Sequence, residues 1–396
     1  MDFELTDEEK AFQEAVRKFG DRVLRPNERR IDTEGQIPAE VIHEMARLGL
    51  LSMLSSSDHG GMGASAVLTE LAAEEIGRGD FSMATAVFFL LEAGWGAVLD
   101  RFGTREAKEE ILPPVCEGKA FLGIATTEPT GGSDLGNMRT RSRRDGSSFV
   151  IRGEKSFLSG VEEAKRLGGG HLTLTRDEKE GFNFIYVPTN SPGISTQKFE
   201  NMGRMGISTG AITYEDVRVP EKYLIGKDRQ GFGCAMEGFT VARTFVSAAC
   251  IGAAERALET GMAYIRERQV FGSPLGKFEG IQFELVDLYT QVEAVKWQCR
   301  RAAWLLDRYT LKGDTSHRSE VDRAVASVKL MAPPLAFDAV RKVMMWFGAA
   351  GYTKDVGLEL GLRGVMSYLV GAEGGLNIMR IILGRELLGK EFLPYK

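Results

Sequence analysis

The sequence predicts an α+β multidomain protein with a helical domain at each end and a β domain between them. Apolar residues recur at helical spacing before about residue 118 and again after about residue 229. The stretch between them has short apolar runs separated by turn residues, which is typical of strands. We therefore expect an N-terminal α-helical domain over 1–118, a β-barrel or sandwich over 119–228, and a C-terminal four-helix bundle over 229–396.

The N-terminal domain begins with a capping box at Thr6-Asp7-Glu8-Glu9. Apolar residues then recur at helical spacing, and Pro26 is expected to end this first helix. Further helices are predicted around 39–51, 65–78, 82–100 and 104–117.

The middle region lacks helical periodicity. Its clearest predicted strands lie at 149–151, 172–175, 182–187 and 212–219. Because no helices intervene between them, a barrel or sandwich is favoured over a parallel sheet. Beyond residue 229, apolar residues recur at helical spacing from Ile281 to Val295, as expected of a bundle helix.

The bulk composition excludes several classes of function. A net charge of −5 and a pI near 5.7 argue against nucleic acid as a main partner. Four cysteines and four histidines are scattered without ligand spacing, so neither disulfides nor a metal site is predicted. No apolar run approaches a membrane span, and the first residues are acidic rather than signal-like. We expect a cytoplasmic protein that binds no membrane.

The turn from Gly123 to Asp134 is the most informative segment. It follows an apolar, strand-like run and combines hydroxyls and carboxylates with the paired glycines Gly131 and Gly132. Glycines let backbone N–H groups approach a polar heterocycle or a phosphate closely. Taken alone, the same letters also fit a hydroxyl-rich surface turn.

This turn, with its Thr127-Glu128-Pro129 and Gly132-Ser133-Asp134, resembles the signature of the acyl-CoA dehydrogenases. A second signature of that family is matched by Arg268, Phe271 and Gly272, which alone would also fit a helix C-terminus. The helical, β, helical order agrees, so the resemblance covers essentially the whole chain. It implies FAD as cofactor, an acyl-CoA substrate, and an oligomer, expected to be a tetramer, in which subunits share each FAD site.

The resemblance also implies roles for individual residues. Ser159 stands where a hydroxyl reaches flavin N5, and Arg268 is expected to reach the FAD pyrophosphate from a neighbouring subunit. The implied FAD-binding residues are Ile124, Thr126, Thr127, Gly132, Ser133, Phe157, Ser159, Arg268, Phe271, Phe278, Gln282 and Gly348. The implied substrate-binding residues are Ser133, Arg243 and Gly374. The match is uneven at Met345 and Ala349 near the FAD loop, and at Thr240 near the CoA region, where the family usually has other residues.

The expected catalytic base is Glu373, but the spacing leaves an alternative open. Counting back from Arg385 places the base at Glu373, whereas counting forward from Arg363 places it at Ala372, because one extra residue intervenes. Either a bulge at Gly371-Ala372 absorbs this residue, or Glu373 is only a first-turn carboxylate of the following helix. Glu92, a carboxylate inside an apolar helix, is a second candidate base, as in relatives that act on cyclohexene-type acyl-CoAs.

Three functions are therefore compared. The leading hypothesis is an FAD-dependent acyl-CoA dehydrogenase that passes electrons to an electron-transfer flavoprotein. The second is a dehydrogenase or reductase of a cyclic acyl-CoA, with room for a ring near Gly94 and the glycines that flank Glu373. The third is an FAD-binding stress-response or scaffold homologue without dehydrogenation.

Overall fold

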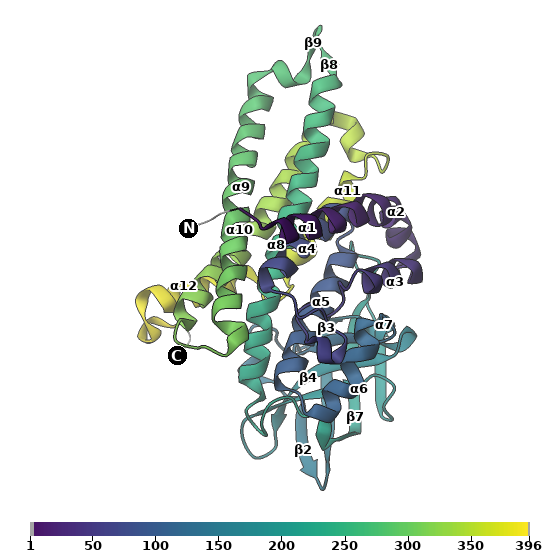
Figure 1. The fold of residues 1–396 in the computed structure, drawn as a ribbon, viewed down its shortest axis with the longest axis vertical. Coiled ribbons are helices and arrows are strands. Elements are labelled where there is room, and N and C mark those ends of the chain that lie inside the picture. The colour runs from purple at the N-terminus through teal and green to yellow at the C-terminus, as the bar shows by residue number, and fades with distance from the viewer. Residues whose placement is uncertain (1–3, 395–396) are drawn as a thin grey trace.

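The computed structural model describes residues 4–394 and has helices at both ends of the chain with a sheet between them (Figure 1). The predicted fold class is confirmed. The N-terminal helices are α1 (Asp7–Phe19), α2 (Arg25–Glu34), α3 (Ala39–Arg47), α4 (Ala66–Gly79), α5 (Ala84–Phe102) and α6 (Arg105–Cys116). The capping box at Thr6 is present, with both of its reciprocal hydrogen bonds. The expectation of an acidic, signal-free start rests partly on residues 1–3, which lie outside the described residues.

The prediction that Pro26 ends the first helix is wrong. The chain continues from α1 through a π-helical turn (Gly20–Leu24) into α2, whose second residue is Pro26. Pro26 lies directly after the π-helical turn, in which the Arg25 N–H group bonds the Gly20 carbonyl oxygen, and the helix continues past it. The π-helical turn places Gly20 against Gly79 of α4, where a Cβ on Gly20 would lie 3.3 Å from the Gly79 Cα.

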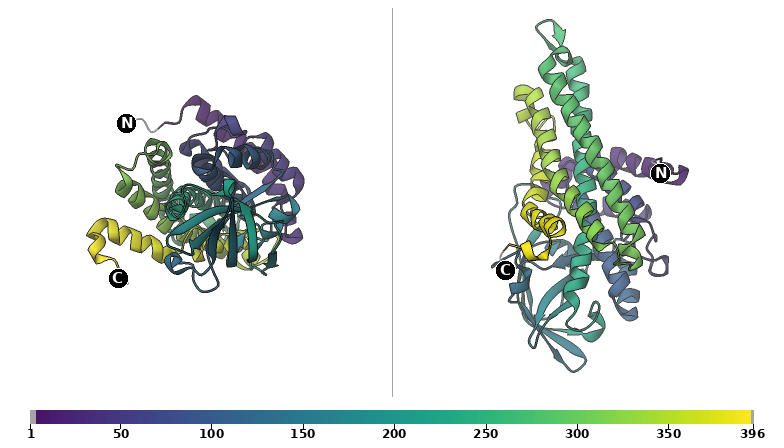
Figure 2. Two further views of the ribbon diagram at one scale, coloured as in Figure 1. Left: turned by 90° about the horizontal axis from the view of Figure 1, so that it is seen from below. Right: turned by 90° about the vertical axis from the view of Figure 1, so that its left-hand side faces the viewer.

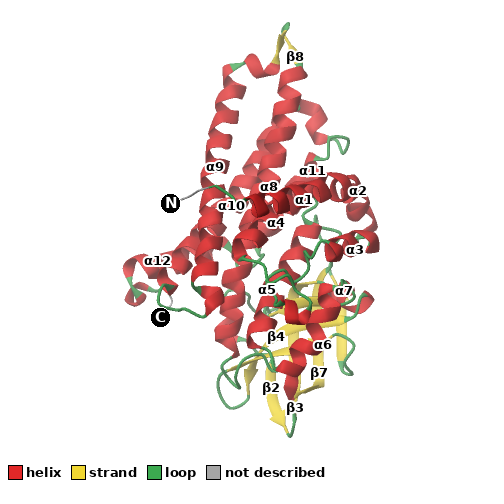
Figure 3. Ribbon diagram, viewed as in Figure 1, coloured by secondary structure: helices red, strands yellow, loops and turns green. Residues whose placement is uncertain are grey.

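The middle domain is one seven-stranded sheet (Figure 3). Its strands are β1 (Phe121–Ala125), β2 (Arg141–Asp145), β3 (Ser148–Ser159), β4 (Gly169–Asp177), β5 (Phe182–Pro188), β6 (Ile194–Lys198) and β7 (Thr209–Pro220). The order is β1-β4-β2-β3-β7-β6, with β5 paired to β4. Most pairs are antiparallel, but β4 pairs in parallel with β1 and β2. A short helix, α7 (Val161–Arg166), intervenes between β3 and β4, which the sequence did not predict.

The C-terminal domain consists of long helices. They are α8 (Gly231–Glu267), α9 (Glu279–Arg308), α10 (Arg318–Trp346), α11 (Leu358–Val370) and α12 (Leu376–Leu388). The ends of α8 and α9 project beyond the other helices and are joined by a hairpin of β8 (Gln269–Val270) and β9 (Ser273–Pro274) (Figure 2). We call these two helix ends and the hairpin the arm.

In the described part of the chain, α8 is long and apolar enough to cross a membrane by length and composition alone, because one 18-residue window of it has a mean hydropathy of 1.2. The expectation that no apolar run approaches this length was therefore wrong. Of that apolar window, 83% is buried inside the protein. Its glycines permit close helix crossings, because a Cβ on Gly252 would lie 1.8 Å from the Glu74 carbonyl oxygen of α4. Packing within the core accounts for the composition of α8.

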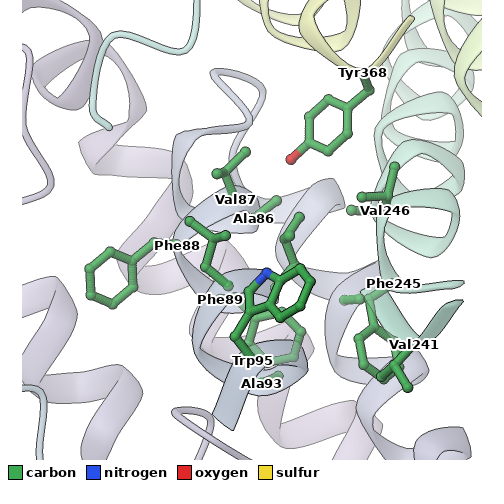
Figure 4. Packing of buried hydrophobic residues seen from close by; sticks show 14 of the residues in the cluster. Ala86, Val87, Phe88, Phe89, Ala93, Trp95, Val241, Phe245, Val246 and Tyr368 are labelled. Atoms are coloured by element: carbon green, nitrogen blue, oxygen red, sulfur yellow. The ribbon is translucent and has the colours of Figure 1, made fainter. Parts of the chain in front are cut away.

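The core joins the three regions beside the candidate site. Trp95 of α5 meets Phe239 of α8 edge to face, with ring centroids 5.3 Å apart, and also contacts Phe184 of β5. Figure 4 shows Tyr368 of α11 above the same cluster, together with Phe245 of α8. Such aromatic pairs bury large apolar areas and fix the relative positions of the elements that carry them.

Candidate active site

A buried ion pair fixes the turn that follows β1. The Lys155 ammonium donates to the Thr126 carbonyl oxygen and to Glu128 Oε1, both at 2.9 Å. Glu128 also accepts the backbone N–H groups of Arg139 and Thr140. Burial lowers the pKa of Lys155 to about 8 against the attraction of Glu128. Although burial opposes it, Lys155 and these backbone donors hold the pKa of Glu128 below its ordinary value. We call the Lys155–Glu128 ion pair the clamp. It is charged, and its hydrogen-bonding groups find partners within the chain, so it holds the turn in place.

The turn presents groups with no internal partners. In the described chain, no hydrogen bond engages the hydroxyls of Thr127, Ser133 or Ser159, and a Cβ on Gly131 would meet nothing within 4 Å. Phe157 is 66% exposed and has a φ of 57° at an irregularity of β3. An exposed aromatic ring on a strained backbone costs free energy when only water covers it. Phe157 and the unpartnered hydroxyls therefore fit a planar ligand that forms hydrogen bonds, such as a flavin ring.

The structure separates the predicted FAD residues into two groups. Arg268 and Phe271 lie at the tip of the arm, at the opposite end of the molecule from the lower part of the middle sheet (Figure 1). Phe271 is 94% exposed, and the described chain shows no ion pair to the Arg268 guanidinium. Phe278 and Gln282 follow the hairpin, and Gln282 donates to the Gly276 carbonyl oxygen. Gly348 is exposed at the end of α10 and has a φ of 60°. Within one chain, the hairpin that follows Arg268 thus lies at the other end of the molecule from the middle sheet (Figure 1).

A turn connects α11 to α12 and carries Glu373. Helix α11 ends at Val370, and Gly371 leaves the helical conformation with φ −158°. The Gly374 N–H group closes the turn on the Gly371 carbonyl oxygen at 3.0 Å. Glu373 itself has a φ of 56° and Gly374 a φ of 100°, both in the left-handed region. Backbone strain of this kind persists where surrounding contacts hold it, and it is frequent at functional sites.

The same turn brings three predicted residues together. Arg243 of α8 donates from Nε to the Glu373 carbonyl oxygen at 2.9 Å. Its guanidinium also lies beside Gly374, where a Cβ would be 3.5 Å from Nη2. Burial lowers the pKa of Arg243 to about 10, partly offset by Glu373. The structure thus unites Glu373, Gly374 and Arg243 in one cluster.

Glu373 has the properties of a general base. Its Oε2 is buried and, within residues 4–394, has no hydrogen-bond partner. Burial raises the pKa of Glu373 to about 7, and the charges of Arg243, Lys329 and Arg204 oppose a larger rise. A base whose pKa lies near the working pH is unprotonated in a large fraction of molecules and still binds a proton strongly enough to remove it from a substrate.

Lys329, Arg204 and Tyr368 also belong to this cluster but were not predicted from the sequence. Lys329 of α10 is fully buried and donates to the Tyr368 carbonyl oxygen at 2.7 Å. Arg204 lies in the loop before β7 and donates to Thr209 Oγ1 at 2.8 Å. The lone lysine in the apolar run 324–337 was a usable signal, because a buried lysine needs partners. No sequence signal places Arg204 there.

Glu92 lies in a different environment. It is fully buried in α5, and its Oε1 accepts the Leu122 backbone N–H group at 3.1 Å. Burial raises its pKa well above the ordinary value, and its Oε2 has no partner in the described chain. Through this hydrogen bond Glu92 supports the edge of β1, the strand that leads into the Thr126 turn.

The space expected near Gly94 is not there. A Cβ on Gly94 would lie 3.4 Å from the Ala242 Cβ of α8, so this glycine allows α5 and α8 to approach closely. The prediction that Gly94 makes room for a ring was wrong.

The pKa of Glu373 predicts the pH dependence of the reaction. A base must be unprotonated, so flavin reduction by acyl-CoA at subsaturating substrate should rise with pH, pass half its maximum near pH 7 and then level off. The measurement is anaerobic stopped-flow absorbance from pH 5.5 to 9. A profile that is flat between pH 6 and 8 would contradict this assignment.

The three-domain fold, the hydroxyl-lined turn and the partly buried carboxylate of Glu373 are what the chemistry of a flavin-dependent oxidoreductase requires. Family models for the N-terminal, middle and C-terminal domains of acyl-CoA dehydrogenase match residues 6–119, 123–217 and 229–388. The chain belongs to the acyl-CoA dehydrogenase family, and its cofactor is FAD.

Individual relatives agree over almost the whole length. The chain is 32% identical to a probable acyl-CoA dehydrogenase of Bacillus subtilis, covering 98% of this chain and 100% of that protein. It is 31% identical to cyclohex-1-ene-1-carbonyl-CoA dehydrogenase of Syntrophus aciditrophicus, covering 97% and 91%. The butyryl-CoA dehydrogenase structure from Megasphaera elsdenii superposes with a TM-score of 0.89 at 26% identity, covering 98% of this chain and 100% of that one.

Proposed function

We propose that the protein desaturates an acyl-CoA thioester between its α and β carbons, with Glu373 as the base. The observation that carries this proposal is the Glu373 carboxylate, which has a buried oxygen without a partner and a pKa raised to about 7. Glu373 removes the α proton and holds it on its carboxylate. FAD, when bound, supplies the acceptor for the β hydride, and an electron-transfer flavoprotein then takes the electrons.

The chain's own groups fit the cofactor in two places. Thr127, Ser159 and the exposed ring of Phe157 would hold the flavin ring, and Ile124, Thr126, Gly132 and Ser133 line the same turn. Arg268 would meet the pyrophosphate, because a guanidinium offers paired donors to phosphate oxygens. Since Arg268 lies on the arm, it would serve the FAD site of another subunit, together with Phe271, Phe278 and Gln282.

An oligomer is supported by the surface of α9. Exposed aromatic and aliphatic side chains recur along one side of this helix over about six turns. They are Phe283, Val286, Tyr289, Trp297 and Trp304. A stripe of this kind marks a protein interface rather than a solvated surface. We propose a second copy of the chain as its partner, within a cytoplasmic homotetramer.

Arg268 gives a direct test of the shared site. Replacing Arg268 with glutamine should weaken FAD binding by roughly 10- to 100-fold, because each charge-assisted hydrogen bond to phosphate contributes about 1.5–3 kcal/mol. Flavin retained after gel filtration at several FAD concentrations measures this loss. The matched control is Arg266→Gln. Arg266 lies two residues earlier in the sequence and is also exposed on the arm. Equal FAD loss in both variants would show that Arg268 does not bind FAD.

The alternative function, dehydrogenation or reduction of a cyclic acyl-CoA, is favoured by the Syntrophus relative. The buried Glu92 is compatible with it only if the acyl group reaches β1. The experiment is anaerobic visible spectroscopy with straight, branched and alicyclic acyl-CoAs. Bleaching with a straight or branched thioester supports our proposal, and bleaching confined to alicyclic thioesters supports the alternative. A lack of bleaching with every thioester would favour the reductase or the non-dehydrogenating homologue.

A further inference from the structure

A grid of arginines covers part of the middle sheet. In strand register, Arg141 of β2 lies opposite both Arg152 of β3 and Arg176 of β4, which makes a row of three across three strands. Residues that are directly opposite share one face of a sheet. Two residues along β2, Arg143 lies opposite Val150, which in turn lies opposite Arg218 of β7. We call Arg141, Arg143, Arg152, Arg176 and Arg218 the arginine grid.

The grid carries more positive charge than its neighbours balance. Asp145 pairs with Arg143 at 3.6 Å and also with Arg218, and Asp216 pairs with Arg152 at 3.5 Å. Arg141, in the centre of its row, has no ion pair in the described chain and is exposed. Five guanidinium groups thus have only two carboxylates as ion-pair partners within residues 4–394, in a protein whose net charge is −5.

This arrangement does not serve the stability of the sheet. Like charges directly opposite each other on neighbouring strands destabilise a sheet. Arg152 and Arg218 are 78% and 59% exposed, so their guanidinium groups face solvent. An unbalanced, exposed row of arginines is instead suited to binding an anionic surface.

The surroundings of the grid decide which anionic partner fits. Within residues 4–394, no exposed large apolar side chain lies on β2, β4 or the 148–152 part of β3, so the grid lacks the apolar contacts of a membrane surface. A row across three strands spans only about 10 Å, which is short compared with the extended charged backbone of a long polyanion such as DNA. Arginine forks pair bidentately with carboxylates and are enriched at protein interfaces.

We propose that the arginine grid docks an acidic protein through carboxylates on that partner's surface. Arg176 donates from Nη1 to the Gly136 carbonyl oxygen at 3.4 Å, which connects the grid to the segment after the Ser133 turn. That segment lines a hollow of about 140 Å³ with Glu128, Gly131, Asp134 and Arg139 among its residues. The docked protein therefore sits beside the turn that carries Ser133. This inference does not depend on the proposed desaturation.

The test uses the flavin-loaded enzyme and a fluorescein-labelled 20-residue peptide of alternating glutamate and serine. Fluorescence anisotropy measures its dissociation constant at 50 and 150 mM NaCl for the natural chain and for Arg141→Gln/Arg152→Gln. The control, Lys312→Gln/Arg323→Gln, removes the same charge from exposed positions next to and on α10. Flavin content and far-ultraviolet circular dichroism check that both variants fold.

We expect the grid variant to bind the peptide at least tenfold more weakly and the control within twofold of the natural chain. Binding should weaken as salt rises, because exposed charges are screened. Hydrogen exchange should show peptide protection within residues 139–152. Equal losses in both variants would overturn the proposal, as would tighter binding of a 20-base-pair DNA duplex or of vesicles with 30% phosphatidylglycerol. Absence of peptide binding at 50 mM NaCl would also overturn it.

Discussion

Glutamine in place of Glu373 should slow anaerobic flavin reduction by a reactive acyl-CoA by roughly 10²- to 10⁴-fold, the usual contribution of a general base. Glutamine keeps the size of the side chain but cannot accept the α proton. The Arg243 bond to the Glu373 backbone carbonyl should persist, so the turn that carries the side chain should remain folded. Stopped-flow absorbance of the oxidised flavin band gives the rate.

Glu92→Gln is the matched control, since it replaces another buried carboxyl with its amide. The amide oxygen can still accept the Leu122 N–H group, so a rate within about threefold of the natural enzyme is expected. Retained reduction in Glu373→Gln together with its loss in Glu92→Gln would assign the base to Glu92 and support the cyclic-substrate alternative.

The second large effect is expected at the Lys155–Glu128 clamp, which holds the turn after β1. Lys155→Met removes one partner of a buried pair and leaves Glu128 charged with only backbone donors. Breaking such a pair costs about 3–5 kcal/mol. Urea denaturation of the apoprotein should show this loss of stability, and flavin should also be retained poorly because the Thr126 carbonyl loses its donor.

A surface pair provides the comparison. Lys165→Met breaks the ion pair between Lys165 and Glu162, and both of these side chains are about half exposed. The free energy of unfolding should therefore change by less than about 1 kcal/mol. The double variant Glu128→Gln/Lys155→Met should be more stable than the sum of the single changes indicates, because no unpaired charge remains. A Lys155→Met protein within 1 kcal/mol of the natural chain would show that the clamp is unimportant.

Much of the fold followed from local pattern. The capping box at Thr6 and the apolar spacing of Ile281 to Val295 both act within one helix, and both predicted helices form. The predicted end of the first helix at Pro26 was wrong because tertiary contacts outweigh local preference there. The π-helical turn before Pro26 packs Gly20 on Gly79. The glycine at position 94 was misread for the same reason, because its neighbour on α8 is invisible in the local sequence.

The site was only partly predictable. Glu373, Arg243 and Gly374 were found through a family resemblance, and the structure places them together. Whether Glu373 is the base stays a prediction. Lys329 and Arg204 join the cluster from elements remote in sequence, and charge effects between such elements depend on distances that spacing does not encode.

The arm has a consequence for how the holoenzyme is made. Because the tip of the arm lies at the other end of the molecule from the middle sheet, the proposed complete FAD site exists only after two subunits meet (Figure 1). Cofactor loading would then be second order in subunit concentration, and dilution would release flavin even at constant free FAD. A newly made chain would remain catalytically silent until it encountered another, so the abundance of the protein would itself govern its activity.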